Sequence, residues 1–418
     1  MKETLERFNE WWFTGKVRKE LAPPFKRYAF KRLAGTLRER QALLLVGPRR
    51  VGKSTLLYQT IEGLLEKVPP SNILYFSFDE EFRDPAEVLG FYEKRILAKP
   101  FEEAGRVYIF LDEVQYAPGW ASTVKRFYDL YPNLKFILSG SSALPLSKEA
   151  MEKLAGRFFT VELGPLLFSE FLELRGLQTT EQRRVEAYFQ DYLRKSGFPE
   201  LAGWEDENRI AEYVRSSVVD RVVFRDLPLL SGGRDAVLAE QLLRLVLSSP
   251  GLTINVNNLS RDLGRSRVTI SHYLRFLELS LLVRSLSNFR TSSLSGSRKL
   301  KRYYPATPSM IFACSRRDFE TKIGAVLETY VVSVLRPKYY YRERKEEIDV
   351  ILTNGEVLPV EVKESAGERE AKEFSERVER LGARRGLLVS WGREEDFGRV
   401  KVVPVYALER ELLRSETE

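Results

Sequence analysis

The sequence of 418 residues contains a single cysteine, Cys314, and a single histidine, His272. One cysteine excludes an internal disulfide, and the two residues together exclude a cysteine cluster or a multi-histidine metal site. Any bound metal must therefore rely mainly on carboxylate and hydroxyl oxygens, which favours Mg²⁺ or Mn²⁺.

Long apolar runs are also absent. No segment reaches the roughly 18 residues that a membrane-spanning helix needs, and the charged start, Met1–Glu6, does not fit a signal peptide. We therefore expect a cytoplasmic protein that has no membrane partner. With one Cys and three Met beside many Arg and Glu, the composition weakly indicates a thermophilic, archaeal type of source.

Acidic residues are missing from one long stretch, Leu279–Arg317. The basic residues there are Arg284, Arg290, Arg298, Lys299, Lys301, Arg302, Arg316 and Arg317, and these eight equal the whole net charge of +8. A block of one sign repels itself unless it meets a polyanion. The block favours nucleic acid as a partner, with a solvated loop as the alternative.

Residues 43–57 combine an apolar run, a glycine-bounded loop and the start of a helical pattern. Gly47 and Gly52 enclose four residues and precede Lys53 and Ser54, which is the Walker A spacing. Such a loop turns backbone N–H groups toward a phosphate at the positive end of a helix. Lys53 is expected to reach the β- and γ-phosphates of ATP, and Ser54 to hold Mg²⁺. The predicted nucleotide-binding loop comprises Gly47, Pro48, Arg49, Arg50, Val51, Gly52, Lys53, Ser54 and Thr55.

A second apolar run ends in Asp112 and Glu113, which is the Walker B pattern. Asp112 is expected to lie near Mg²⁺, and Glu113 to orient or activate the attacking water. A third strand pattern ends at Ser139, which is predicted either to sense the γ-phosphate or simply to end the strand. Arg126 and Arg157 are candidates for an arginine finger that acts on a neighbouring subunit, with surface salt bridges as the alternative.

Residues 259–277 predict a helix-turn-helix, with Gly264 at the turn and Ser266 capping the second helix. Ile270, Leu274 and Leu277 recur at helical spacing and are expected to face the core. Such a helix enters the major groove in DNA-binding proteins, although a winged helix used only for packing or nucleotide sensing is the alternative. The predicted DNA-binding set is Arg265, Arg267, Thr269, His272, Arg275, Arg298, Lys299, Lys301 and Arg302.

The C-terminal part contains a second group of acids in apolar surroundings. Glu361 and Lys363 alternate with Val360 and Val362, so strand periodicity puts the acid and the lysine on one face. Two carboxylates can hold a metal beside a phosphodiester while a lysine steadies the attacking water. Asp349, on the preceding strand pattern, is the expected second carboxylate.

Asn354 and Gly355 mark a hairpin between these two strand patterns. A two-residue loop there pairs Asp349 with Val360, so that Asp349 and Glu361 face opposite sides of the sheet. Because a shared metal requires both acids on one face, we predict a three-residue loop or a bulge in this hairpin.

Five motifs occur in a fixed order, namely Gly47–Ser54, Asp112–Glu113, Ser139–Ser142, Leu154–Arg157 and Gly197–Pro199. With these motifs the chain resembles archaeal and bacterial AAA+-type ATPases that carry a C-terminal restriction-endonuclease-like domain. The resemblance covers nearly the whole chain. It implies a small helical lid that closes over the nucleotide, and a ring-shaped homo-oligomer, specifically a hexamer.

Asp349 followed by Glu361-x-Lys363 resembles the signature of restriction-endonuclease-like domains, and Glu328 corresponds to the acid on that family's helix. The sequence departs from the pattern at Ile348, where the family often has proline. The resemblance implies catalytic roles for Asp349, Glu361 and Lys363, and metal binding by Glu328, Asp349 and Glu361. The alternative is a degenerate nuclease fold.

The predicted fold class is α/β. The expected parts are an N-terminal helix and P-loop AAA+ core with a parallel sheet (1–165), a helical lid (166–235), a winged helix-turn-helix domain (236–310) and a restriction-endonuclease-like α/β domain (311–418).

Two functions remain open from the sequence. The first is a Mg²⁺-dependent ATPase with a metal-dependent endonuclease, acting on DNA in repair, recombination or defence. The second is an ATP-driven signalling switch or scaffold whose nuclease-like domain only binds a protein or DNA. The intact set of acids and lysine favours the first. ATP and Mg²⁺ are the expected cofactors, with Mn²⁺ as an alternative at the nuclease site.

Overall fold

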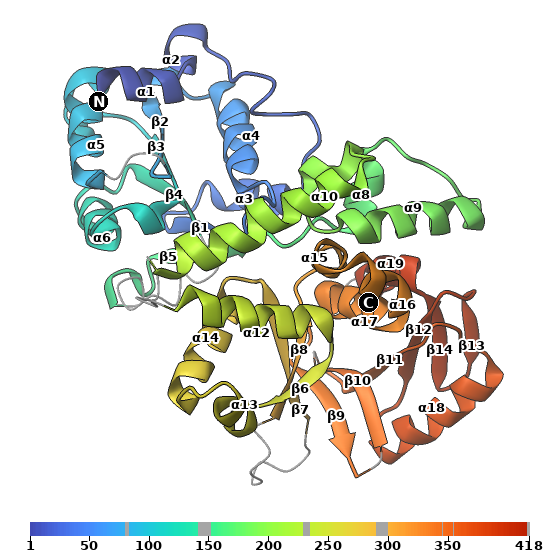
Figure 1. Ribbon diagram of the computed structural model, residues 1–418. Helices are drawn as coiled ribbons and strands as arrows, with labels where there is room; N and C mark the ends of the chain where they lie inside the picture. The colour runs from blue at the N-terminus through green and yellow to red at the C-terminus, as the bar shows by residue number, and fades with distance from the viewer. Residues whose placement is uncertain are drawn as a thin grey trace. The chain divides into compact units, whose positions relative to one another are not determined.

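The computed structural model describes residues 1–79, 83–140, 152–228, 235–289, 300–344, 346–353 and 355–415 (Figure 1). The chain divides into two compact units, Met1–Gly164 and Pro165–Glu418. No helix within the described ranges has the length and apolar character needed to cross a membrane.

The first unit is organised around a five-stranded sheet in the order β2-β3-β4-β1-β5. Every neighbouring pair is parallel, which confirms the predicted parallel sheet. The strands are β1 (Ala42–Val46), β2 (Ile73–Ser77), β3 (Val107–Asp112), β4 (Leu134–Gly140) and β5 (Phe158–Glu162). The inner strands are nearly continuous apolar runs because both of their faces are buried.

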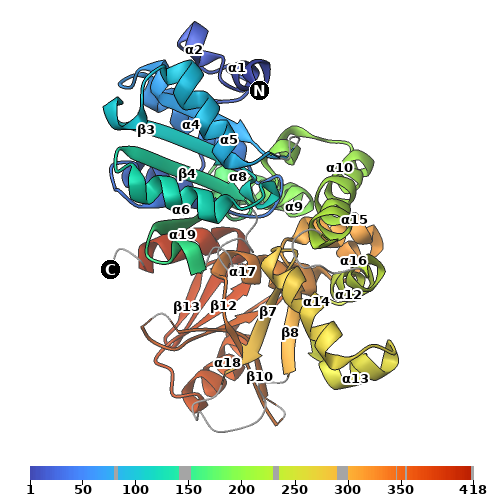
Figure 2. The same cartoon turned by 90° about the vertical axis from the view of Figure 1, so that its left-hand side faces the viewer.

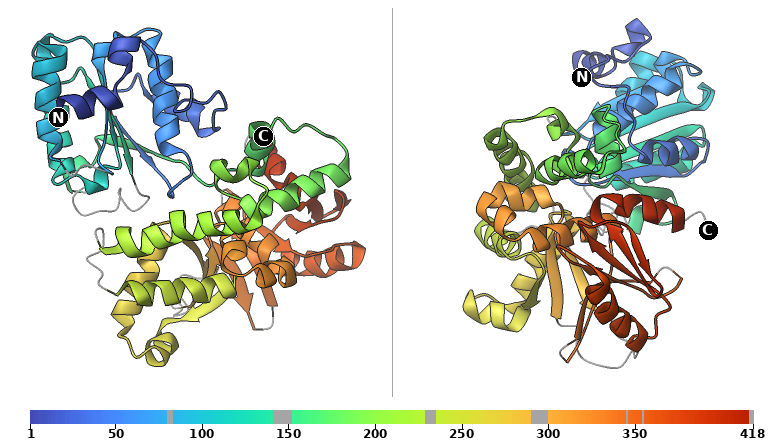
Figure 3. Two further views of the ribbon diagram at one scale, coloured as in Figure 1. Left: turned by 45° about the horizontal axis from the view of Figure 1, so that its top comes forward. Right: turned by 90° about the vertical axis from the view of Figure 1, so that its right-hand side faces the viewer.

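Side chains of β1 alternate between two hydrophobic clusters, one on each face of the sheet. Leu43 and Leu45 pack with residues of α3 and α4, whereas Leu44 and Val46 pack with residues of α1, α5 and α6. Helices therefore cover both faces, as the left panel of Figure 3 shows for α4 and α5. The helices of this unit are α1 (Lys2–Phe8), α2 (Trp11–Thr14), α3 (Ala29–Thr36), α4 (Lys53–Leu65), α5 (Pro85–Tyr92) and α6 (Trp120–Leu130).

The second unit begins with a helical segment, and the role of residues 166–235 as a lid stays a prediction. It contains α8 (Phe168–Leu174), α9 (Gln182–Lys195), α10 (Glu207–Tyr213), two π-helical turns, η7 (Val214–Asp220) and η8 (Val222–Asp226), and then α12 (Ala236–Ser248). Glu409 in the last helix, α19 (Leu408–Ser415), accepts hydrogen bonds from the backbone N–H groups of Phe168 and Ser169 at 2.7 and 2.9 Å. The C-terminal helix is thereby tied to the start of α8.

A nine-stranded sheet forms the rest of this unit, in the order β13-β14-β12-β11-β10-β9-β7-β8-β6. One sheet thus runs through both parts predicted as separate domains, 236–310 and 311–418. The strands are β6 (Leu252–Asn255), β7 (Val283–Asn288), β8 (Leu300–Pro305), β9 (Tyr339–Glu343), β10 (Glu346–Leu352), β11 (Leu358–Val362), β12 (Gly386–Ser390), β13 (Glu395–Phe397) and β14 (Val400–Pro404).

Different helices pack on different parts of this sheet, as Figure 2 shows for α17 and α18. Phe374 and Val378 of α18 cluster with Ile348 and Ile351 of β10, and α17 contacts β8, β10 and β11. A bulge between Ile348 and Ile351 allows both side chains to join the same cluster although they lie three positions apart. The remaining helices are α13 (Val256–Asp262), α14 (Arg267–Leu279), α15 (Pro308–Cys314), α16 (Arg316–Thr321), α17 (Ile323–Leu335) and α18 (Glu368–Arg380).

Candidate functional site

The Walker A loop connects β1 to α4, as its sequence predicts. Gly52 precedes the helix with φ of 96°, a conformation that residues with a Cβ rarely adopt. Gly47 is required for a different reason, because a Cβ there would lie 2.2 Å from the carbonyl oxygen of Leu163. Arg27 holds the loop from outside by donating to the carbonyls of Val51 and Gly164 at 2.8 and 3.1 Å.

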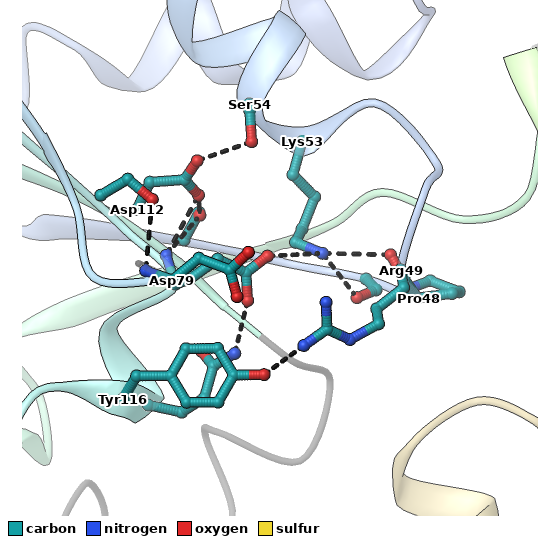
Figure 4. Close-up of polar contacts among 12 residues, drawn as sticks. Pro48, Arg49, Lys53, Ser54, Asp79, Asp112 and Tyr116 are labelled. Carbon is teal, nitrogen blue, oxygen red and sulfur yellow. Dashed lines mark hydrogen bonds and ion pairs between the residues drawn. The ribbon is translucent and has the colours of Figure 1, made fainter. Parts of the chain in front are cut away.

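Lys53 is nearly buried, with 5% of the residue exposed. Its Nζ donates to the carbonyls of Gly47 and Pro48 at 3.2 and 3.0 Å and lies 3.6 Å from Glu113 Oε1. Figure 4 shows Lys53 between Pro48 and Arg49 of the loop on one side and Asp112 on the other. The cation therefore lies at the carboxyl edge of a parallel sheet, where such folds bind ligands.

Asp112 brings together the residues predicted to hold Mg²⁺. The Ser54 hydroxyl donates to its Oδ2 at 2.6 Å (Figure 4), and Tyr75 donates to the same oxygen at 2.8 Å. Ser139 is fully buried and donates to Oδ1. The hydroxyl of Ser139 is thus engaged in positioning the Walker B carboxylate, and γ-phosphate sensing by this residue stays a prediction.

The two adjacent acids have opposite electrostatic environments. Burial, together with the neighbouring Glu113, raises the pKa of Asp112, and hydrogen bonds from Ser139, Ser54 and Tyr75 offset this only in part. Burial by itself would also raise the pKa of Glu113, but Lys53 and Arg49 outweigh it, and the pKa lies below its ordinary value. Glu113 also has a φ of 53°, a left-handed conformation that costs energy for a residue with a side chain.

Sequence reasoning missed three residues at this site. Tyr75 reaches Asp112 from the adjacent strand β2, Asp79 lies at the same edge of the sheet, and Tyr116 accepts a hydrogen bond from Arg49 (Figure 4). The parallel pairing of β2 with β3 ends with Ser77 opposite Asp112. A prediction that these strands are neighbours would have pointed to the residues near the end of β2. Residues at the ends of neighbouring strands are expected to converge.

The two arginine finger candidates have different surroundings within the first unit. Arg157 forms an ion pair with Asp129, with Nε 2.9 Å from Oδ1. Arg126 is exposed on α6, and its guanidinium lies 5.3 Å from the centre of the Phe127 ring. The ion pair agrees with the structural alternative for Arg157, whereas a role in a neighbouring subunit stays a prediction for both.

In the second unit, β10 and β11 pair with Val350 opposite Val360. Continuing this register places Asp349 opposite Glu361, so the predicted shift of register is confirmed. The last described pair is Leu352 with Leu358, and the three-residue loop or bulge itself stays a prediction. Asn354 lies outside the described residues.

The predicted acids and lysine gather on this face of the sheet. Lys363 Nζ lies 2.9 Å from Glu361 Oε1, and the backbone N–H of Val362 donates to Asp349 Oδ2 at 2.9 Å. Glu328 reaches the same region from α17, where it accepts a hydrogen bond from Tyr304. Arg377 from α18 lies 3.1 Å from Glu361 Oε1 and was not foreseen. We refer to Glu328, Glu347, Asp349 and Glu361 as the carboxylate cluster.

Arg302 was predicted to bind DNA, and this prediction is wrong. The guanidinium is buried, with 8% of the side chain exposed, and lies 3.6 Å from Glu328 Oε1 and 3.7 Å from Asp349 Oδ1. It also forms an ion pair with Glu347. These acids need a cation nearby because a buried charge without a partner is unfavourable. Arg302 of β8 supplies this cation.

Burial and repulsion between the acids raise the pKa values of two members of the carboxylate cluster. Burial, Glu328 and Glu361 raise the pKa of Asp349 well above its ordinary value. Burial raises the pKa of Glu328 as well, although Tyr304 and Arg302 act against this shift. Burial would lower the pKa of Lys363, but Glu361 outweighs it and the pKa is raised.

The cluster does not have the arrangement of a metal site. Among the described residues, no group of three or more His, Cys, Asp or Glu side chains is placed to hold a metal ion. The predicted metal ligands Glu328 and Asp349 converge on Arg302, whereas Glu361 turns toward Lys363 and Arg377. The acids predicted for this site are therefore close together without fitting a divalent metal.

Helix α14 has the features predicted for the second helix of the helix-turn-helix. Ser266 caps it by accepting a hydrogen bond from Thr269 N–H at 3.1 Å, and Ile270, Leu274 and Leu277 are buried. The side chains of Arg265 and Arg275 are 51% and 59% exposed, and Arg267 and His272 are also exposed. A groove of about 360 Å³ lies between α14, β6 and β8, and its lining includes Asn257, Arg267, Ser271, Arg275 and Lys301.

The acid-free stretch is less positive in space than in sequence. Lys301 lies 3.1 Å from Glu278, Arg316 pairs with Glu207 at 3.7 Å, and Arg302 lies in the carboxylate cluster. Acids from distant segments therefore neutralise part of the block, which a reading along the chain cannot detect. Arg298 and Lys299 of the predicted DNA-binding set, and Ser141 and Ser142 of the predicted motifs, lie outside the described residues.

Comparison with protein families agrees with the geometry of the first site. Residues 39–172 match the model of an AAA domain. Residues 186–318 and 323–408 match two domains of unknown function, DUF8612 and DUF4143. The chain therefore contains an AAA-type P-loop ATPase domain, and the other two matched segments are similar to domains of unknown function.

Curated relatives are uncharacterized proteins. One, from Haemophilus influenzae, is 28% identical over 57% of this chain and 60% of its own length, so the match spans less than two thirds of that relative. Two from Methanocaldococcus jannaschii are 25% and 23% identical over 81% and 84% of this chain, and over 79% and 81% of their own lengths.

Solved structures with some similarity include the Aeropyrum pernix ORC1 protein in complex with DNA, at a TM-score of 0.34 and 16% identity, covering 73% of this chain and 97% of that one. Cdc6p from Pyrobaculum aerophilum has a TM-score of 0.31 and 14% identity, with coverage of 73% and 99%. Likeness at this level carries no argument about the function of this chain.

Proposed function

We propose that this protein binds and hydrolyses Mg²⁺-ATP and uses the nucleotide cycle to act on nucleic acid. The observation that carries the ATPase part is the convergence of Lys53, Ser54, Asp112 and Glu113 at the carboxyl edge of one parallel sheet. ATP hydrolysis requires a phosphate-binding cation, a magnesium ligand pair and a group that orients water, and these four residues supply them.

The residues present fit a magnesium ion. Ser54 and Asp112 form a hydroxyl–carboxylate pair with oxygens 2.6 Å apart, which are the oxygen ligands that Mg²⁺ prefers. Ser54 and Asp112 would hold the ion, which would supply positive charge to stabilise the reacting phosphates. Lys53 binds the phosphates by leaving its carbonyl partners. Glu113, whose lowered pKa keeps it ionised at neutral pH, orients the attacking water and accepts its proton.

Steady-state ATP turnover with and without Mg²⁺ tests this proposal. We expect Mg²⁺-dependent release of phosphate by wild type and none above background by Lys53→Ala. Lys67→Ala is a matched control, because Lys67 is exposed just beyond the end of α4. Turnover that persists in Lys53→Ala at the wild-type rate would rule out the predicted site.

The oligomer is a further part of the proposal. Arg126 or Arg157 would complete the ATP site of a neighbouring subunit in a ring, a hexamer by resemblance. Mixing two inactive variants tests this, because Lys53→Ala retains the arginine and Arg126→Ala, or Arg157→Ala, retains the lysine. Activity restored by mixing identifies an arginine that acts in trans. An arginine variant with wild-type turnover excludes that residue.

Nucleic acid is proposed to bind the surface of α14 and the adjacent strands, read as a winged helix. Support comes from the exposed basic residues Arg265, Arg267 and Arg275 on and before one helix, since phosphate contacts provide most of such affinity. The ion pair of Arg265 with Asp235 competes only weakly with phosphate, because ion pairs near the surface contribute little.

Fluorescence anisotropy with labelled duplex, single-stranded, forked and four-way DNA measures this binding. Arg267→Ala and Arg275→Ala are each expected to weaken binding and to lower the salt dependence by about one unit of slope. Arg369→Ala is the matched control, since that arginine is 85% exposed on α18. Equal losses in all three variants would show that binding follows net charge and not this surface.

A DNA endonuclease in the C-terminal part is a second candidate function. The observation in its favour is the gathering of Glu328, Asp349, Glu361 and Lys363 on one face of the sheet. Against it stands Arg302, which occupies the position between two of the acids. The alternative of a binding module that does not cleave is therefore favoured for the arrangement described here. Incubating the same DNA panel with Mg²⁺ or Mn²⁺, with and without ATP, tests cleavage, and wild type is expected to leave every substrate intact.

A further inference from the structure

The most unusual polar feature of the second unit is a buried arginine among carboxylates. Arg302 extends from β8 with 8% of its side chain exposed and lies within 3.7 Å of both Glu328 and Asp349. Its other terminal nitrogen contacts Glu347, and the guanidinium lies 4.8 Å from the centre of the Tyr340 ring. The cation is therefore held by acids from α17 and β10 and by an aromatic ring from β9.

These contacts put Arg302 where a shared metal ion would have to lie. A divalent metal needs several carboxylate oxygens about 2.0–2.6 Å from one point, and here the oxygens of Glu328 and Asp349 both face the guanidinium. Glu361 is directed to other cations, and its buried Oε2 has no hydrogen-bond partner among the described residues. A buried carboxylate oxygen without a partner is unfavourable, and it would gain from a new cation.

We propose that Arg302 is the resident cation of the carboxylate cluster and that it excludes divalent metal ions from it. A guanidinium stays protonated in proteins, so this charge cannot be lost by titration. A metal ion and the guanidinium would repel each other at this distance in a buried site. Metal binding therefore requires that Arg302 leave the cluster.

The strand that carries Arg302 also carries a basic residue on its opposite face. Lys301 lies 3.1 Å from Glu278 of α14 and 3.2 Å from the Ser285 hydroxyl of β7, because successive side chains of a strand alternate. Lys301 thus has the same charge and nearly the same position in sequence without touching the cluster. This makes it a matched control.

Binding of Mn²⁺ alone, followed by electron paramagnetic resonance on the full chain without nucleotide, tests the proposal. Mn²⁺ binding by wild type is expected not to depend on Asp349, so Asp349→Asn should bind as much Mn²⁺ as wild type. Arg302→Gln is expected to gain one site with at least about tenfold tighter binding than wild type, and the double variant Arg302→Gln/Asp349→Asn is expected to lose it. Lys301→Gln is expected to behave as wild type.

Several results would overturn the proposal. Wild type that binds Mn²⁺ through Asp349 as tightly as Arg302→Gln does would show that the arginine excludes nothing. A folded Arg302→Gln without the new site would show that the cluster is no metal site even when exposed. If Arg302→Gln does not fold, Arg302→Met replaces it, because this side chain is long and carries no charge. A folded Arg302→Met without any gain in Mn²⁺ binding would also refute the proposal. ATP turnover is measured in parallel and depends on the first unit. It therefore distinguishes failure of the metal-exclusion proposal from failure of the proposed ATPase function.

Discussion

The nucleotide site and the carboxylate cluster solve the same electrostatic problem in different ways. Both hold largely buried acids beside a buried basic side chain, which is Lys53 in one site and Arg302 in the other. In the first, Lys53 donates to carbonyls of its own loop and lies 3.6 Å from Glu113. In the second, Arg302 comes from another strand and lies between Glu328 and Asp349. A cation held by its own loop can exchange partners when phosphate arrives, whereas a cation held by three acids serves as part of the structure.

The largest effect should come from removing the cation of the nucleotide site. Lys53→Ala is expected to lower ATP turnover by about 1,000-fold, because the preorganised positive charge at the phosphates is lost. Its unfolding midpoint should stay near that of wild type, since the lysine neutralises no acid that lacks other donors. Turnover and urea unfolding measured on the same sample would separate the two effects. A large loss of stability in Lys53→Ala would contradict the difference proposed between Lys53 and Arg302.

Removing the cation of the carboxylate cluster should lower stability and leave ATP turnover nearly unchanged. Arg302→Ala is expected to lower the unfolding free energy by about 3 kcal/mol, because Glu328 and Asp349 would stay buried without their partner. ATP turnover by the protein that remains folded should be little changed. Lys301→Ala is the control, and equal destabilisation by both substitutions would contradict the role assigned to Arg302.

The acid beside Lys53 should affect chemistry without affecting nucleotide binding. Glu113→Gln is expected to lower turnover by about 100-fold, since the amide cannot accept a proton from water. Binding of a fluorescent ATP analogue should be retained. Glu103→Gln, an exposed acid before β3, should match wild type, and a Glu113→Gln variant with full turnover would remove this residue from the mechanism.

A buried acid that has no basic partner within the described part of the chain completes the comparison. Glu409 is 5% exposed and accepts from two backbone N–H groups and from the Ser169 hydroxyl at 2.6 Å. Glu409→Gln is expected to lower the unfolding free energy by about 1 kcal/mol, because an amide satisfies these donors less well.

The effect of Glu409 should also depend on pH. Burial raises the pKa of this carboxyl above its ordinary value of 4.5, so its contribution to stability is complete below that value and is lost as pH rises through the folded-state pKa. The difference between wild type and Glu409→Gln should narrow as pH rises above 4.5. Urea unfolding across this range measures it, and a difference that widens would contradict the raised pKa.

The nucleotide site was largely predictable from the sequence because its parts are local. Gly47, Gly52, Lys53 and Ser54 lie within one loop, and a glycine spacing dictates its geometry. Tyr75 was missed because its contact with Asp112 depends on which strands are neighbours. Strand order is set by packing, and a sequence pattern does not state it.

Three acids of the carboxylate cluster, Glu328, Asp349 and Glu361, were predicted from the sequence, whereas Glu347 and the pairing with Arg302 were not. Strand periodicity put Glu361 beside Lys363, and the requirement for a common face anticipated the register of Asp349. The assignment of Arg302 to a DNA-binding surface failed because it followed local charge. The partners of Arg302 are Glu328 on α17 and Asp349 on β10. These two elements come close to β8 only in the folded sheet.

By itself the sequence determined the Walker loop, the alternation of strands and helices, and which acids could share one face of a strand. These depend on residue spacing and on the period of each element, which hold wherever the element forms. Tertiary structure alone decided that one sheet runs from β6 to β13, that distant acids neutralise the basic stretch, and that Arg302 lies among the carboxylates. Burial makes an unpaired charge costly, so the fold selects its counterion by proximity in space.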